Sequence, residues 1–210
     1  MRVLRFLGLH VSAAHVLGDD VTASGSSYNF IAIDLPTPAG LLGFTTLADI
    51  NEKGEITGGF TDSNLGLFGF FLDEKMRPSD LRCSKAVVST TPQSINKHGE
   101  IAGFATVATT NIETPKTPFG IATIRISGFF RYKNGRCTIL DFPGANLTEA
   151  IGVNDDGQVV GNYLDAAGNF HGFFWDAGLF LTIDVPFPDA TITGPTAINN
   201  VGQIIGFYFR

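Results

Sequence analysis

The chain has 210 residues, of which 44% are hydrophobic and 16% are charged. This balance argues against a disordered protein and suits one domain with a core of its own. The formal net charge is −6, with no cluster of Lys and Arg, so nucleic acid is not an expected partner. No uninterrupted apolar run reaches the roughly 18 residues of a membrane span, so none is expected.

Residues 1–27 are set apart from the rest of the chain. Arg2 and Arg5 precede a mainly apolar stretch over 6–18, which His10 and His15 interrupt, and small residues at 21–23 suit a cleavage site. The segment is either an export signal or a disordered N-terminal tail. We expect a single β-repeat domain over residues 28–210.

A nine-residue motif occurs four times in that domain. Its copies are INEKGEITG at 50–58, INKHGEIAG at 95–103, VNDDGQVVG at 153–161 and INNVGQIIG at 198–206. Two further patterns recur with it. They are Gly-Phe-Phe at 69–71, 128–130 and 172–174, and an Ile/Leu-Asp-x-Pro sequence at 33–36, 140–143 and 183–186.

The spacing of these patterns defines a unit of about 45 residues, which is the length of a propeller blade. With 25 Gly and 19 Phe, the composition indicates short strands joined by tight turns. We therefore predict an all-β, repeat-built, β-propeller-like fold of about four blades, with the last blade incomplete or the whole an open, truncated arc.

The third copy shows the predicted strands best, over 149–154, 158–164, 170–175 and 180–185. In each copy the Asn starts a hairpin turn, and the first Gly needs a positive φ; these are Gly54, Gly99, Gly157 and Gly202. The second Gly lies mid-strand, where close approach of another backbone is typical. We interpret that approach as packing between blades. The first Phe of each Gly-Phe-Phe is predicted to lie in the core.

The second copy carries an insertion of about 14 residues, which we place within 106–124. It has Thr, Asn and Pro and no apolar alternation, which predicts a protruding loop between two strands.

The ends of the repeat array pose the problem of closure. Residues 29–35 match the last strand of a unit, and the chain ends soon after the second strand of the fourth. Because open edges invite aggregation, we expect the N-terminal strand to join the last blade beside residues 204–208. The alternative is an open arc, cut from a longer array or completed by another chain.

The hairpin motif, followed by His171-Gly172-Phe173 and then by Ile183-Asp184-Val185-Pro186, resembles the HAF repeats of bacterial extracellular proteins. The resemblance covers roughly residues 28–210, and Gly stands where the His-Ala-Phe signature has Ala. The other copies have Phe68 and Ser127 in place of the His. The resemblance implies a secreted, propeller-like protein and assigns no activity.

Residues with chemical potential are few. His98 and His171 fall at a turn and a strand start, without the spacing of a zinc site. Asp34, Asp141 and Asp184 recur at one register, which favours local capping of the backbone over a catalytic group. Cys83 and Cys137 could form one disulfide or remain thiols. We assign no catalytic, cofactor-binding or metal-binding residue and expect no cofactor.

Three functions remain open. The first is a non-enzymatic, extracellular β-repeat module for binding or scaffolding, with an extracellular protein or a glycan as partner and with oligomers forming through an open blade edge. The second is a carbohydrate-active hydrolase that uses carboxylates at a propeller mouth. The third is a truncated family member without activity.

Overall fold

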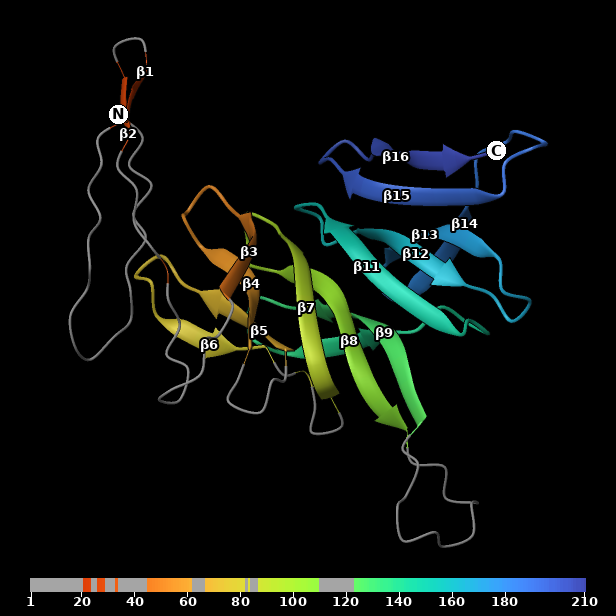
Figure 1. Cartoon of the computed structure of the whole chain (residues 1–210), viewed down its shortest axis with the longest axis horizontal. Helices are drawn as coiled ribbons and strands as arrows, with labels where there is room; N and C mark the ends of the chain where they lie inside the picture. The colour runs from red at the N-terminus through yellow and green to blue at the C-terminus, as the bar shows by residue number, and fades with distance from the viewer. Residues whose placement is uncertain are drawn as a thin grey trace, which may run out of the picture.

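The structure is a computed structural model that describes residues 21–23, 26–28, 33, 45–61, 67–81, 83, 87–109 and 123–210. Within these residues the chain is all-β and contains no helix, and hence none long and apolar enough to cross a membrane. Four antiparallel sheets follow one another along the chain as an open arc, shown from orange to blue in Figure 1. We call these sheets blades 1 to 4. The predicted all-β, propeller-like fold with an incomplete last blade is confirmed.

Blades 1 to 3 each contain four strands that pair in chain order, as in a meander. Blade 1 comprises β3 (Thr45–Ile50), β4 (Ile56–Thr61), β5 (Leu67–Leu72) and β6 (Pro78–Asp80). Blade 2 comprises β7 (Val87–Ile95), β8 (Ile101–Thr109), β9 (Thr123–Arg131) and β10 (Cys137–Leu140). Blade 3 comprises β11 (Leu147–Val153), β12 (Val159–Leu164), β13 (Phe170–Asp176) and β14 (Leu179–Ile183).

Blade 4 has two strands in the described chain, β15 (Ile192–Ile198) and β16 (Ile204–Phe209). A separate hairpin of β1 (Val21–Ala23) and β2 (Ser26–Tyr28) lies far from the arc (Figure 1). The predicted boundary at residue 28 therefore falls inside β2. The strands predicted for the third copy agree with β11 to β14 within two residues at either end.

The expected closure of the arc by residues 29–35 is not seen at Ile33. Ile33 is the residue of 29–35 that the structure describes, and it lies outside the strands. It packs in the core of blade 1 with Ile56, Phe70 and Leu72. Blade 4 is consequently not completed by Ile33.

The predicted insertion in blade 2 is partly taken up by strands. Both β8 and β9 have nine residues, so 106–109 and 123–124 belong to a long hairpin and not to a loop. The remainder of the predicted loop, residues 110–122, lies outside the described residues.

The repeated turn behaves as its sequence predicts. Gly54, Gly99, Gly157 and Gly202 have φ between 77° and 80°, the left-handed region in which glycine is favoured. In blade 3 the Oδ1 atom of Asn154 accepts hydrogen bonds from the backbone amides of Asp156 and Gln158, at 3.1 and 3.0 Å. The Asn side chain thus closes its own turn.

The same Asn side chain also joins one blade to the next. The Nδ2 atom of Asn51 donates to the backbone carbonyl of Asn96 at 2.9 Å. In the same way, Nδ2 of Asn96 donates to the carbonyl of Asn154 at 2.9 Å, and Nδ2 of Asn154 donates to the carbonyl of Asn199 at 3.1 Å. Asn96 and Asn154 are 4% and 3% exposed. These three bonds form what we call the Asn ladder, which fixes the turn of each blade against the turn of the next.

The second Gly of the motif has a role different from the predicted one. Each of these glycines faces a β-bulge in the first strand of its own blade, between Leu47 and Asp49 in β3 and at matching positions in β7, β11 and β15. A Cβ on Gly161 would collide with the carbonyl oxygen of Glu149, which is in the same blade. The close backbone approach is confirmed, but its interpretation as packing between blades is wrong.

The third strand lays an aromatic ring over that glycine. Phe70, Phe129 and Phe173 pair across the sheet with Gly58, Gly103 and Gly161. All three rings are at most 1% exposed, which confirms their predicted place in the core. A side chain on the glycine would displace both the ring and the bulge.

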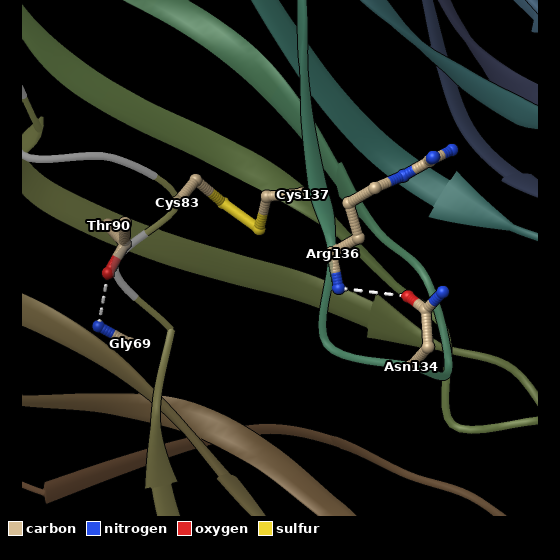
Figure 2. Close-up of a disulfide and its surroundings, with 6 residues drawn as sticks. All are labelled: Gly69, Cys83, Thr90, Asn134, Arg136 and Cys137. Atoms are coloured by element: carbon tan, nitrogen blue, oxygen red, sulfur yellow. Dashed lines mark hydrogen bonds between the residues drawn. A yellow bond between two sulfur atoms is a disulfide. The ribbon is translucent and has the colours of Figure 1, made fainter.

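Blades 1 and 2 are held together by further contacts that Figure 2 shows. Cys83, which follows β6, forms a disulfide with Cys137 at the start of β10, with 5.2 Å between the two Cα atoms. Nearby, the backbone amide of Gly69 in β5 donates to the hydroxyl of Thr90 in β7. A cross-link between residues 54 positions apart stabilises the fold by about 4 kcal/mol in the chain-entropy account.

We predict that Gly161→Ala destabilises the protein more than Gly202→Ala does. A Cβ at Gly202 would meet no atom, so this substitution adds only the strain of a left-handed backbone, which destabilises the protein by about 1 kcal/mol. Gly161 meets the Glu149 carbonyl and a ring carbon of Phe173 at 2.9 Å, which costs roughly 3 kcal/mol. Urea unfolding of both variants measures the difference, and equal losses would contradict the role assigned to the bulge.

Candidate functional site

The two recurrent aspartates that the structure describes, Asp141 and Asp184, contact side chains in two different blades. Asp141 pairs with Arg125 of β9, with 3.3 Å between the Oδ1 and Nη2 atoms. Asp184 lies 2.9 Å from the Nδ1 atom of His171 on β13. Asp34 lies outside the described residues. The two described aspartates thus bind side chains of their own blades, so the expectation that each caps its local backbone is wrong in its choice of partner.

His171 links two loops of blade 3. Its Nδ1 atom contacts Asp184, which follows β14, and its Nε2 atom lies 3.4 Å from Asp165 in the turn between β12 and β13. The imidazole stacks on Tyr163, with 5.1 Å between the ring centroids. This arrangement orients the ring and gives the histidine a structural role. In the described part of the chain, no group of three or more His, Cys, Asp or Glu side chains is arranged to hold a metal ion.

Asp165 organises the turn beside His171. The backbone amide and side-chain amide of Asn169 donate to its two carboxylate oxygens at 2.8 and 3.0 Å. These hydrogen bonds, with a smaller contribution from His171, lower the pKa of Asp165 to about 2. The carboxylate is therefore ionised at all physiological pH values.

A hollow lined by both aromatic and charged side chains lies between blades 2 and 3. We call it the interblade cleft; its cavity volume is about 310 Å³, within the range of small-ligand sites. Three aromatic side chains and five charged or titratable ones line it. They are Phe130, Tyr132 and Trp175, with His98, Glu100, Asp155, Asp156 and Asp176.

The strand ends bring these residues together. Phe130 lies near the end of β9, and Trp175 lies near the end of β13, with 5.4 Å between their ring centroids; Tyr132 follows β9 directly. His98 and Asp156 occupy the same position of their respective hairpin turns, which the Asn ladder holds side by side. The cleft therefore has an aromatic floor and an acidic rim.

The rim carboxylates differ in their surroundings. Glu100 accepts from Asn96 at 2.8 Å, and Asp176 accepts from Gln158 at 3.2 Å. Desolvation alone would raise the pKa of Asp155, but hydrogen bonds from Lys97 and Asn200 outweigh it and lower the pKa. Asp156 is exposed at the turn. It is the rim carboxylate best placed to meet an incoming ligand.

The floor is not an open stacking platform. Phe130 and Trp175 are 2% and 4% exposed, so they offer a ligand only their edges. Tyr132 is half-buried and has the guanidinium of Arg136 over its ring at 4.8 Å. A ligand would be held mainly through hydrogen bonds and charge at the rim, with the aromatic edges excluding water beneath it.

The motifs and their spacing along the chain do not predict this cleft. His98 was interpreted as a scattered turn residue, and Tyr132 and Trp175 were not singled out. The alignment of the four turns contained the needed signal, because equivalent turn positions of successive repeats lie next to one another. Comparison of the chain with protein-family models gave no matching family, and comparison with curated proteins gave no match.

We predict that the carboxyl of Asp165 titrates at about 2. Because this pKa is below that of the unfolded chain, the stabilisation is complete above pH about 4 and is lost as the pH falls through 2. Asn169→Ala removes the side-chain hydrogen bond but keeps the backbone amide that donates to Asp165, so it should raise the pKa part of the way towards the ordinary value. A carboxyl ¹³C NMR titration measures both, and a wild-type pKa near the ordinary value for Asp would refute the network.

Proposed function

We propose that the protein is a non-enzymatic, extracellular β-repeat module that binds a protein or glycan ligand at the interblade cleft. The cleft is the observation that supports this proposal most strongly, because it combines a ligand-sized cavity with a rim rich in acceptors. Ammonium and guanidinium groups of a protein and hydroxyl groups of a glycan are all donors that such a rim can bind.

The repeated residues support a structural interpretation of the repeat itself. The Asn and both Gly of each unit, and the Phe of the first three units, are engaged in turns, bulges and core packing. What varies between the turns is the residue pair after each Asn, which includes His98 and Asp156. Specific recognition would therefore depend on these variable turn residues, while the repeat supplies a rigid frame.

The disulfide supports the extracellular part of the proposal. Bonds such as Cys83–Cys137 persist in oxidising compartments and are rare in the reducing cytosol. The hairpin motif and His171-Gly172-Phe173 support kinship with HAF-repeat proteins, which we propose on these sequence features alone.

The hydrolase alternative has less support. Two-carboxylate glycosidases place an acid and a nucleophile or base across one bond. Asp141 and Asp184 instead pair with Arg125 and His171 in different blades. Their separate engagement favours a binding function.

A binding screen with a charge-reversed cleft tests the proposal. Polysaccharide and peptide arrays are probed with wild type, with Asp156→Arg, and with Glu74→Arg as a matched control at an exposed turn of blade 1. We expect the wild-type ligand to bind Asp156→Arg about tenfold more weakly or worse, with the control unchanged.

Two results would contradict the proposal. A ligand whose affinity ignores Asp156→Arg would place recognition outside the cleft. Release of sugar from a bound polysaccharide by the wild type would establish the hydrolase instead.

A further inference from the structure

The junction between successive blades is built in the same way three times. The apolar residue before each Asn is buried at the junction with the preceding blade. These residues are Ile95, Val153 and Ile198, whose exposed fractions are 6%, 7% and 9%. The residue before each second Gly is buried at the junction with the following blade, as Thr57, Ala102 and Val160 are at 0%. Ala102 of blade 2, for example, belongs to the core cluster of blade 3 that includes Val153.

Blade 1 lacks this cover on its outer side. Ile50 occupies the position of Ile95, Val153 and Ile198 but is 50% exposed. Leu47 pairs with the second Gly of blade 1, and Ala150 pairs with the second Gly of blade 3. Leu47 is 45% exposed, whereas Ala150 is 0% exposed. The first strand of blade 1 therefore presents an apolar surface that elsewhere lies in a junction.

Blade 4 lacks the complementary cover. Ile205 occupies the position of Thr57, Ala102 and Val160 but is 68% exposed. Phe207 and Phe209 on the same strand are 47% and 56% exposed. Both ends of the arc thus carry one half of the junction that the interior forms three times.

The polar part of the junction is incomplete at the same ends. Asn199 has the side chain that donates to the next blade in the other copies, but here it donates to Gln203 within its own turn, at 2.7 Å. At the other end, the backbone carbonyl of Asn51 corresponds to the carbonyls that accept from a preceding blade in the ladder. Here it accepts from the amide of Gly54 within its own turn. A donor at one end matches an acceptor at the other.

The next turn residue repeats this match. The backbone amide of Lys97 donates to the Asp155 carboxylate at 3.0 Å, and that of Asp155 donates to the Asn200 side chain at 2.9 Å. By the same register, the amide of Asn200 faces position 52 of a following unit. Position 52 of blade 1 is an exposed Glu, a suitable acceptor.

Ile33 shows that blade 1 is shaped to follow another blade. On blade 2 the corresponding core position is filled by Leu81, which follows β6, and on blade 3 by Leu140, which ends β10. On blade 1 it is filled by Ile33. Ile33 therefore occupies, on blade 1, the core position that a residue at or after the outer strand of the preceding blade fills on blades 2 and 3.

We propose that blade 4 of one copy binds blade 1 of a second copy through this junction, so that two copies close a ring. The contact is heterologous, with the Ile205 surface of one copy on the Ile50 surface of the other. Asn199 of each copy donates to Asn51 of the other, which continues the Asn ladder around the ring. Two arcs supply eight blade positions, within the range of known propellers.

Paired charge substitutions test this head-to-tail contact. Light scattering should give wild type twice its chain mass of 22.4 kDa at tens of micromolar. Ile50→Asp and Ile205→Asp should each weaken association about 100-fold or more. Leu179→Asp, at a residue 74% exposed on β14, is the matched control and should leave the dimer intact. Unchanged circular dichroism spectra verify that each variant folds.

Mixing the two disruptive variants distinguishes this contact from other dimers. Ile50→Asp keeps an intact blade 4 and Ile205→Asp an intact blade 1, so the mixture should regain one junction and form heterodimers. A Glu52→Cys copy should also cross-link to an Asn200→Cys copy. A monomeric wild type, a filament, a dimer that tolerates either substitution, or a mixture that stays monomeric would each overturn the proposal.

Discussion

The Asn side chain at each hairpin turn is the interaction on which this arc of blades depends. Its oxygen closes its own turn, and its nitrogen reaches the carbonyl of the next turn, as in Asn96 to Asn154. Both residues are nearly inaccessible to solvent. Because a buried side-chain N–H group without a partner is costly, the Asn that shapes the turn of one blade also fixes where the next blade lies.

Within the repeat, the residues that maintain the structure differ from those that are free to recognise a ligand. The Asn, the two Gly and the Phe are fully occupied in holding the sheets, whereas the turn positions beside them vary from copy to copy. His98 and Asp156 lie at such positions and come together at the interblade cleft because the ladder aligns their turns. Likewise, the exposed Ile50 and Ile205 mark the two ends of the arc because their equivalents are buried inside it.

Local geometry was readable from the sequence, whereas contacts between distant segments were not. The φ of Gly157 follows from a turn of a few residues, and the burial of Phe173 follows from its recurrence in three units. The repeated Gly161 predicted a close backbone approach, but the sequence did not reveal that the approaching group is the Glu149 carbonyl at a bulge of the same blade. Nor did it reveal the pairing of His171 with Asp165 and Asp184, or the disulfide, since spacing along the chain does not determine which side chains meet.

The free energy of unfolding of Asn154→Asp tests the ladder most directly. The new carboxylate still accepts from the two turn amides but can donate neither to the Asn199 carbonyl nor to the side chain of Gln158. Asn134→Asp is the control, because Asn134 is exposed and its side chain only accepts, from Arg136 (Figure 2). We predict a loss of about 3 kcal/mol for Asn154→Asp and less than about 0.5 kcal/mol for the control. Equal, small losses in both variants would contradict the account.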